Sequence, residues 1–514
     1  MKSASMHLPL IFSVVFPGLA AASSILFSGG TVIGFDSATE SLDVIRNGSV
    51  LVTNDRIAGV YSGAPTAPLP KGTEIIDITD KIITTGFVDT HKHGWQTAFK
   101  TLGSNTSLVE YFGRYGQFVT GTIFTADDVY IGQLAGIYEA LNGGVTTILD
   151  HAHHTWGTAQ SNAGLKASID SGARVFWSYA FAPLTNVNYS LEQQFSDFRD
   201  IAKAASFKGT PTSLGIAYDS FGPNPNVSEV NVVMGLAKEF NVSVITTHSL
   251  QGPWGFDNSP EDVNNLGYLN ISIPIVFSHA SFLTNAGASL LRATNQYISI
   301  TAESEMHYGH THPHSHLIQD QASLGIDTHF TFSSDILTQA RLWLQVTRRQ
   351  LYAEVLARWQ VPSNNPMSVD QAFLLATRHG GLALRRNDIG VLAVGAKADL
   401  VVWDGTSPAL LGWNDPVAAI ILHASVGDIE HVLVDGKFKK RDFKIVERSY
   451  PDVRKRFLKS AKRIQGVLVN TITPLPKAGD PWPYNELEIG ETNTVDTLRG
   501  KGKGYGELFL DAGK

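Results

Sequence analysis

The strongest constraint on the fold is a regular alternation of apolar, β-branched runs with helical patterns through the middle of the chain. Helical patterns, such as those at 126–142 and 229–239, separate many of the runs. Strands that alternate with helices form parallel sheets covered on both faces, which explains the continuous apolar runs. Eight βα units over residues 81–390 predict a (β/α)8 TIM barrel, with an open doubly wound sheet as the alternative. The eight runs lie at residues 82–89, 145–150, 173–181, 213–219, 242–247, 273–278, 296–301 and 328–333.

The segments on either side of this region have a different texture. Residues 23–80 contain short alternating strands separated by turns, and strand texture returns over residues 391–450. Two strand-rich segments that flank one barrel are expected to pair, so they predict a small β-sandwich domain built from both ends of the chain. Residues 451–514 are polar and rich in Lys, Pro and Gly, which predicts a helix to about residue 470 and then a tail.

Residues 1–22 have the features of a secretory signal peptide. Lys2 precedes an apolar run at 8–16 that is too short to span a bilayer. Ala20-Ala21-Ala22 then supplies the small residues for cleavage near Ala22/Ser23. We therefore expect a secreted protein with no membrane contact after signal cleavage, the alternative being a retained membrane anchor.

Composition agrees with secretion and narrows the choice of partners. The chain has no cysteine, so disulfides and thiolate metal ligands are both excluded, and its 43% hydrophobic residues can build a large core. The formal net charge is -7 and no basic stretch could neutralise phosphates, so we expect a small-molecule substrate and no nucleic acid. Six Asn-x-Ser/Thr sequons predict N-glycosylation, at Asn47, Asn105, Asn188, Asn226, Asn241 and Asn270.

Polar side chains gather at the carboxyl ends of the predicted strands, where a barrel enzyme carries its active site. The first strand ends in His91-Lys92-His93, and residues two apart in a strand point the same way, so both histidines can bind one metal. The fifth strand ends at His248, the sixth at His279 and the eighth at Asp335. This convergence suits Zn2+ or, alternatively, Fe2+. The structural alternatives are a hydrogen-bonded core histidine and, for Asp335, a helix cap.

These motifs resemble the amidohydrolase superfamily, and within it the branch of cytosine deaminase-like, guanine deaminase-like and triazine hydrolase enzymes. The resemblance covers residues 25 to about 445 and rests on 86–93, 395–402 and 434–436. It implies one divalent metal, with Zn2+ as the first choice, on His91, His93, His248 and Asp335. It also implies that His279 hydrogen-bonds the activated water or the substrate and that Asp335 is the general base. We expect a secreted, fungal-type member.

Two departures from the pattern of related enzymes bear on the chemistry. Deaminases of this branch carry Glu three residues after the fifth-strand histidine, whereas this chain has Gln251, which cannot exchange a proton at neutral pH. The fourth strand ends in Ala217-Tyr218-Asp219 and offers no lysine to bridge two metals, which favours a mononuclear site.

Glu303 and Glu305 follow the seventh strand and share one face by the period of a strand. We hypothesise that one of them replaces the missing proton shuttle, and the alternative is solvated loop charge. Together with Trp95-Gln96 they are similar to a subgroup with His-x-His-x-Trp-Gln and Glu-x-Glu motifs.

Further pocket candidates follow the first, second and fifth strands. Trp95, Gln96, His153 and Gln251 are expected to contact the substrate, and His151 shares a face with His153. A histidine tract predicts a loop over the barrel mouth that contributes one or two pocket residues. Its members are His307, His310, His312, His314 and His316.

These residues predict a metal-dependent hydrolase that acts on a C–N bond, other than a peptide bond, in a small cyclic or aromatic molecule. Gln251 motivates one alternative, which is a relative recruited to lactone or C–C bond hydrolysis or to a lyase step in secondary metabolism. A second alternative is a non-catalytic binding protein that kept the fold. Homo-oligomerisation is expected because related enzymes are often dimers or larger, and no interface can be recognised in the sequence.

Overall fold

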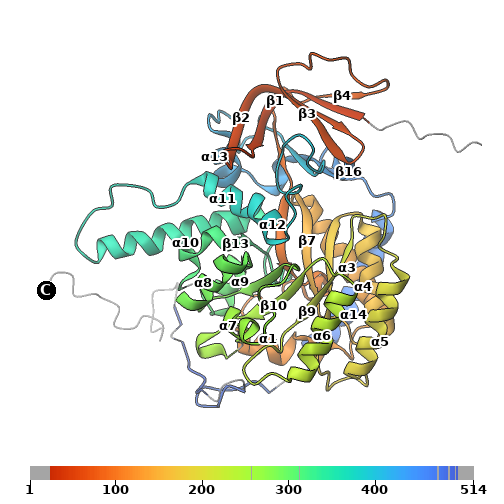
Figure 1. The fold of residues 1–514 in the computed structure, drawn as a ribbon, viewed down its shortest axis with the longest axis vertical. Coiled ribbons are helices and arrows are strands. Elements are labelled where there is room, and N and C mark those ends of the chain that lie inside the picture. The colour runs from red at the N-terminus through yellow and green to blue at the C-terminus, as the bar shows by residue number, and fades with distance from the viewer. Residues whose placement is uncertain are drawn as a thin grey trace, which may run out of the picture.

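The computed structural model places a barrel beside a separate sheet made from both ends of the chain (Figure 1). It describes residues 24–255, 257–311, 313–471, 474–483, 487–492 and 494–495. The predicted signal segment and its cleavage site lie outside the described residues.

Eight parallel strands form the barrel, in the order β13 to β6. The amides of Ile326 and Asp327 donate to the His91 carbonyl at 3.0 and 2.7 Å, so the segment after β13 lies against β6 and brings the last strand beside the first. The predicted (β/α)8 barrel is therefore confirmed. The strands are β6 (Phe87–Lys92), β7 (Val145–Ala152), β8 (Arg174–Phe181), β9 (Ser213–Tyr218), β10 (Ile245–Ser249), β11 (Ile275–His279), β12 (Tyr297–Ile300) and β13 (Ala322–Leu324).

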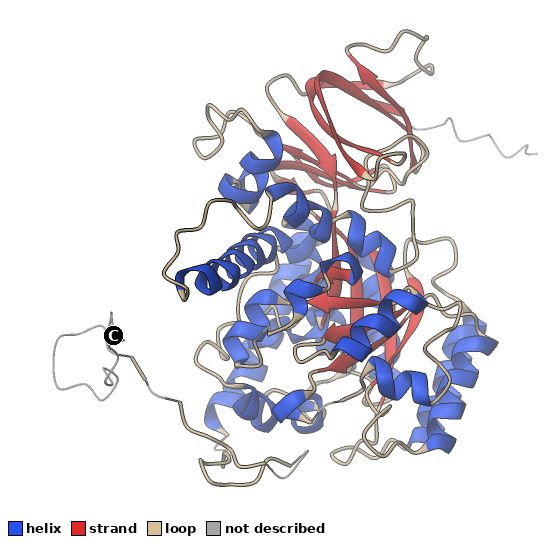
Figure 2. Ribbon diagram, turned by 60° about the vertical axis from the view of Figure 1, so that its left-hand side comes forward, coloured by secondary structure: helices blue, strands red, loops and turns tan. Residues whose placement is uncertain are grey.

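Helices surround the barrel strands (Figure 2). Several begin at a Ser or Thr that caps the first turn together with an acidic or amide side chain three residues on, as Thr125 does with Asp128. Fully buried apolar side chains such as Val175, Ile216 and Phe277 fill the space between strands and helices. The helices that follow the barrel strands are α3 (Ala126–Asn142), α4 (Thr158–Ser171), α5 (Leu191–Ala204), α6 (Val227–Glu239), α7 (Pro260–Asn265), α8 (Asn285–Thr294), α9 (Ala302–Tyr308), α10 (Ile336–Leu356), α11 (Val369–Ala376) and α12 (Arg378–Ala383).

The eighth barrel strand lies earlier in the chain than predicted. Residues 328–333 have the composition of a strand, but they form turns in a loop, and the strand is β13 (Ala322–Leu324). The aromatic side chain of Phe330 explains the apolar texture of this loop. It packs against Phe99 and Tyr115 in a small satellite core above the barrel.

Strands from both ends of the chain form one nine-stranded sheet. Its two halves meet where β5 pairs antiparallel with β14, so the first predicted run divides between the small sheet (β5) and the barrel (β6). The side chains of Phe27, Val50 and Leu433 are fully buried in its own core. The strands are β1 (Ser24–Asp36), β2 (Ser41–Thr53), β3 (Arg56–Ser62), β4 (Glu74–Asp77), β5 (Ile82–Thr85), β14 (Leu400–Trp403), β15 (Ile429–Val434), β16 (Lys437–Arg441) and β17 (Lys444–Ile445).

The last long helix, α14 (Tyr450–Asn470), returns to the barrel. The Gln465 side-chain amide donates to the Ala98 carbonyl in the short helix η1 (Gly94–Phe99) that follows β6. Within the described part of the chain, no helix is both long enough and apolar enough to cross a bilayer. The asparagines of all six sequons are exposed, including Asn241 at the end of α6.

Candidate metal centre

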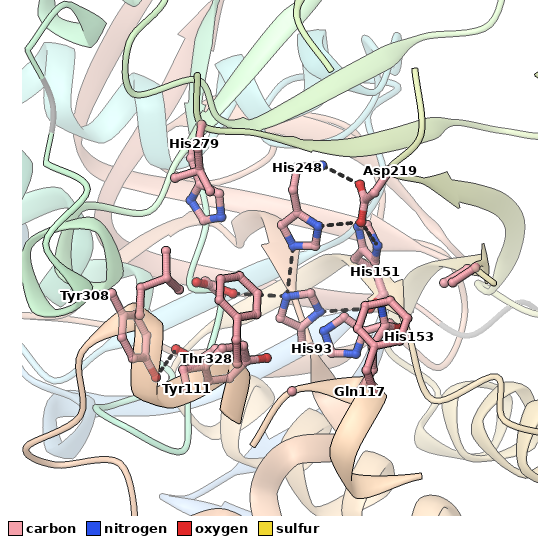
Figure 3. Close-up of a pocket in the computed structure, with 18 of the residues that line it drawn as sticks. His93, Tyr111, Gln117, His151, His153, Asp219, His248, His279, Tyr308 and Thr328 are labelled. Carbon is pink, nitrogen blue, oxygen red and sulfur yellow. Dashed lines mark hydrogen bonds and ion pairs between the residues drawn. The ribbon is translucent and has the colours of Figure 1, made fainter. Parts of the chain in front are cut away.

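Four histidines and one aspartate converge at the carboxyl ends of the barrel strands, and Figure 3 shows three of these histidines around the cavity. The Nε2 atoms of His93 and His248 lie 3.3 Å apart. Asp327 Oδ1 lies 3.1 Å from His93 Nε2 and 3.4 Å from His91 Nε2. A ligand atom of His279 lies within 4.8 Å of those of His91 and Asp327.

The opposite nitrogen of each histidine ring is held by a neighbour. Because Nδ1 is engaged in every case, Nε2 is the atom left for the centre, which is how histidine ligands are oriented in metal sites. The partners of Nδ1 are the Ser278 hydroxyl for His91 (2.7 Å), the His151 carbonyl for His93 (2.9 Å), the Asp219 carboxylate for His248 (2.8 Å) and the Thr301 hydroxyl for His279 (2.9 Å).

These contacts leave two unshared electron pairs facing each other. The His151 carbonyl and the Asp219 carboxylate can only accept, so Nδ1 carries the proton in neutral His93 and neutral His248. When both rings are neutral, their Nε2 atoms, 3.3 Å apart, each offer a lone pair, and one cation between them can bind both. Ligand atoms about 2.1 Å from a tetrahedral zinc ion lie roughly 3.4 Å apart. The observed separations of 3.1–3.4 Å fit one divalent ion.

The ionisation states of the carboxylates also suit a metal. Burial alone would raise the pKa of Asp327, but hydrogen bonds with His91 and His93 hold it well below its usual range. Asp219 is partly buried, and His248 and His151 keep its pKa well below the ordinary value. Both groups are therefore anionic, one toward the centre and one behind His248.

The prediction that Asp335 is a ligand and the general base is wrong in this structure. Asp335 caps the N-terminus of α10, where its Oδ1 accepts the Thr338 amide at 2.7 Å and its Oδ2 accepts the Ser333 hydroxyl. Asp327 takes the place at the end of the eighth strand. The error follows from the misplaced strand. The loop at 328–333 has the composition of a strand, and Asp335 would lie at the carboxyl end of that strand.

A signal for Asp327 was present in the sequence. Asp327 follows a short apolar stretch that includes Gly325. The structure leaves no room for a side chain at Gly325. A Cβ there would lie 2.8 Å from the His91 amide nitrogen and 2.7 Å from Ser299 Oγ. Gly325 therefore lets the chain cross close to β6, which places Asp327 beside the two histidines.

The two glutamates after the seventh strand lie in helix α9 instead of in a continued strand. Glu305 is fully buried, and its Oε1 lies 3.3 Å from His279 Nδ1 and accepts the Thr301 amide at 2.9 Å. Glu303 packs outward, with Oε2 accepting from the Gln339 side chain, and burial raises its pKa to about 7. Neither side chain lines the cavity, and Glu305 contacts the cavity residue His279.

Trp95, Gln96 and His153 form a layer around the centre. The His153 ring, which lines the cavity, stacks on His93 with centroids 3.8 Å apart. Trp95 Nε1 donates to His153 Nδ1 at 2.9 Å, so neutral His153 carries its proton on Nε2. Gln96 donates to the hydroxyl of Tyr111, another cavity residue. Trp95 and Gln96 are fully buried behind the cavity wall and orient His153 and Tyr111 instead of touching substrate.

Replacing Trp95 with Phe should lower kcat/KM by about 10- to 100-fold, the range for losing a group that orients a metal ligand, because His153 stacks on the ligand His93. The substitution keeps an aromatic ring but removes the proton that fixes the His153 tautomer. Trp177→Phe is the matched control, because Trp177 is equally buried and its Nε1 has no hydrogen-bond partner among the described residues. Steady-state kinetics of both variants check this, and equal losses would contradict the assigned role of Trp95.

Gln251, which was expected to contact the substrate, does not line the cavity. Its backbone has φ 60°, and its side chain is buried outside the cavity, with Oε1 making no hydrogen bond to any described residue. Leu250 lines the cavity from this segment.

The cavity above the centre has a volume of about 370 Å³. Figure 3 shows His93, His151, His248 and Asp219 grouped on one side of it, with Tyr111 and Tyr308 facing them. Of the described residues that line it, none is Lys, Arg or Glu. Aromatic and apolar walls with a few convergent polar groups are typical of sites for small, flat and uncharged molecules. The apolar walls include Leu108, Phe112, Phe118, Phe181, Pro183 and Leu250.

The histidine tract contributes one described residue to this cavity. His310 lines it, with its ring edge-on to that of His279 and centroids 4.8 Å apart. His307 and His314 instead bond to backbone carbonyls of Gly103 and Leu283, at 3.1 and 2.9 Å. His312 lies outside the described residues. His151 lines the cavity together with His153, whose face it shares, and its Nε2 lies 3.4 Å from the carboxylate of Asp219. Asp219 joins the site with no role assigned to it from the sequence.

The family model for the amidohydrolase family matches residues 82–439. A 5-methylthioadenosine/S-adenosylhomocysteine deaminase from Thermococcus kodakarensis is 25% identical over 435 residues, which cover 80% of this chain and 93% of the relative.

Two solved structures are similar in fold. An adenosine deaminase from Xanthomonas campestris with bound zinc superposes with a TM-score of 0.73 at 17% identity, covering 86% of this chain and 99% of that one. An atrazine chlorohydrolase from Arthrobacter aurescens complexed with zinc gives a TM-score of 0.72 at 16% identity, covering 85% and 100%. At these identities the match concerns the fold.

Proposed function

The chain belongs to the amidohydrolase family, and on that premise we propose that it hydrolyses a C–N bond, other than a peptide bond, in a small uncharged cyclic or aromatic molecule. The observation that carries the proposal is the meeting of His91, His93 and His248 Nε2 with the Asp327 carboxylate. Nitrogen and oxygen ligands at this spacing suit zinc, the metal named for the two similar structures.

A zinc ion, when bound, lowers the pKa of a coordinated water and polarises the bond under attack. The chain supplies the proton transfers. Asp327 is anionic, and its Oδ2 accepts the Ser304 hydroxyl, which directs Oδ1 toward His91 and His93. Asp327 can therefore take a proton from the attacking water and return it to the leaving group.

His279 acts as a hydrogen-bond acceptor in this proposal. Its Nδ1 faces the Thr301 hydroxyl and the Glu305 carboxylate, and burial lowers the pKa of His279 to about 4. The ring is therefore neutral, with its proton on Nδ1, and Nε2 can accept from water or substrate. His153 has the opposite polarity and offers an N–H, suited to a carbonyl oxygen or ring nitrogen of the substrate.

Several related enzymes act on purine compounds, as the deaminase from Thermococcus kodakarensis does by its name. The cavity of this chain favours uncharged members of that substrate class, because neither Lys nor Arg is among the described residues that line it. Gln251 supports the second candidate, hydrolysis of a lactone or a C–C bond or a lyase step. These reactions need no acid at the position where deaminases carry Glu.

Removing the metal tests the proposed chemistry. Dialysis against a chelator should abolish turnover of a panel of aminopurines, aminotriazines, cyclic amides and lactones, and one equivalent of Zn2+ per chain should restore it. Release of ammonia would assign deamination, and product formation without ammonia would assign the second candidate. Full activity in protein shown to be free of metal would contradict both.

We further propose that the protein is secreted and N-glycosylated in a eukaryotic, fungal-type pathway. The signal-like residues 1–22 and the six exposed sequon asparagines support this. Protein from a eukaryotic secretory host should lose mass at each occupied site on glycosidase treatment, and mass spectrometry would show this. An unmodified chain that keeps residues 1–22 would contradict the proposal.

A further inference from the structure

Two separate segments form the mouth of the cavity. The first contains α1 (Leu108–Arg114) and α2 (Gln117–Thr120), which follow the first barrel strand and supply Tyr111, Phe112 and Phe118 to the wall. The second follows the fifth strand and contains Leu250 and η2 (Gly252–Trp254). Each is a connection that rises from its own strand, so the distance between them depends on contacts between the two connections as well as on the barrel.

A part of the chain beyond the family match lies across both segments. The family model ends at residue 439, and α14 is followed by residues 474–483. The Trp482 ring packs against Phe112 of α1, with centroids 5.9 Å apart, and edge-on against Trp254 of η2, at 5.8 Å. Trp482 Nε1 also donates to the Trp254 carbonyl at 2.7 Å. Its residual exposure is only 6%, although it lies in a polar tail.

A second contact joins the same segment to α1. Leu475 Cδ2 lies 3.1 Å from the point that a Cβ on Gly113 would occupy, so the absence of a side chain at Gly113 lets the tail approach this helix. Among the described residues, the tail thus contacts α1 at Gly113 and Phe112 and η2 at Trp254. Aromatic contacts of this kind stabilise a pair of segments by more than their buried area alone.

We propose that Trp482 is a positioning residue that joins the two sides of the mouth and so sets the size of substrate the cavity admits. It acts through Phe112 and Trp254, and it does not itself line the cavity. Trp482 adds a direct link from Phe112 to Trp254 to the contacts that α1 already makes elsewhere, such as the hydrogen bond from Gln96 to the Tyr111 hydroxyl. Its removal should therefore loosen α1 and α2 relative to η2. The link to substrate size rests on the proposed function, whereas the link between the two segments does not.

Hydrogen exchange of the full-length, metal-loaded protein tests this inference. Trp482→Ala should accelerate amide exchange about tenfold or more in peptides covering 108–120 and 250–255. Exchange in the barrel strands and the metal content should stay at wild-type values. Trp482→Phe, which keeps a ring and loses the N–H, should give a smaller acceleration. Trp359→Ala is the control, because Trp359 is 82% exposed and lies in the loop after α10.

The same variants separate positioning from general stabilisation. With any substrate that the wild type hydrolyses, Trp482→Ala should raise KM several-fold and change kcat by less than about twofold. Unchanged exchange at 108–120, or an equal acceleration across β7 to β9, would overturn the proposal. If the wild type proves inactive on every substrate tested, the exchange result still decides whether Trp482 joins the two segments.

Discussion

Asp327→Asn is expected to lower turnover by roughly 10²–10⁴-fold, the range for losing a positioned general base, and to reduce metal content as well. The substitution keeps the size of the side chain and removes the charge that His91 and His93 face at 3.4 and 3.1 Å. An amide oxygen is a poorer metal ligand than a carboxylate and cannot accept a proton at neutral pH. Kinetics paired with elemental analysis of the purified variant measure both losses.

Asp335→Asn is the matched control for this prediction. Asp335 caps α10, and Asn is as good a helix cap as Asp, so activity, metal content and stability should all stay close to wild type. Asp335→Ala should keep activity and lose about 1 kcal/mol of stability with the cap. The assignment of the general base would be wrong if Asp335→Asn lost turnover and Asp327→Asn kept it.

Asp399→Asn is expected to reduce the free energy of unfolding by about 3–5 kcal/mol, the usual cost of breaking a buried ion pair. Asp399 precedes β14 in the small sheet, and Arg174 begins β8 in the barrel. The two make a bidentate pair at 3.0 and 3.1 Å, with side-chain exposures of 2% and 4%. The Asp435 amide also donates to Asp399 at 2.8 Å. Losing the charge leaves the Arg174 guanidinium buried beside Asp435 alone.

An exposed pair of the same geometry serves as the control. Arg292 and Asp320 also form two hydrogen bonds, at 2.7 and 2.8 Å, but their side chains are 45% and 55% exposed. Asp320→Asn should therefore cost only about 0–1 kcal/mol, because water already screens this pair. Denaturant unfolding of both variants measures the difference. Equal costs would show that Asp399 does not join the two domains in the way that its contacts indicate.

The parts of the fold that follow from local periodicity could be predicted from the sequence. Alternating βα runs gave the barrel, and strand texture at both ends gave the shared small sheet. The four histidines of the centre were identified because each lies at the end of a strand, and the strand ends of a barrel meet at one face whatever the length or sequence of the loops. They are His91, His93, His248 and His279. Asp399 belongs to the motif at 395–402, but its ion pair with Arg174 joins distant segments and could not be predicted from that motif.

The errors arose where one local pattern fitted two structures. The loop at 328–333 reads as a strand because Phe330 is buried, in a satellite core rather than in the barrel. Glu303 and Glu305 share a face only if the strand continues, and the chain turns into α9 directly after Thr301. The partners of the ligand histidines, such as Ser278 and Asp219, depend on contacts between distant strands, which no local pattern records.

Anomalous diffraction from crystals of the metal-supplemented protein tests the central claim most directly. Data on both sides of the zinc absorption edge should show one peak per chain, bounded by Nε2 of His91, His93 and His248 and the carboxylate of Asp327. X-ray fluorescence from the same crystals identifies the element. Well-ordered side chains at these positions with no anomalous peak between them, or a peak beside Asp335 in their place, would contradict the account.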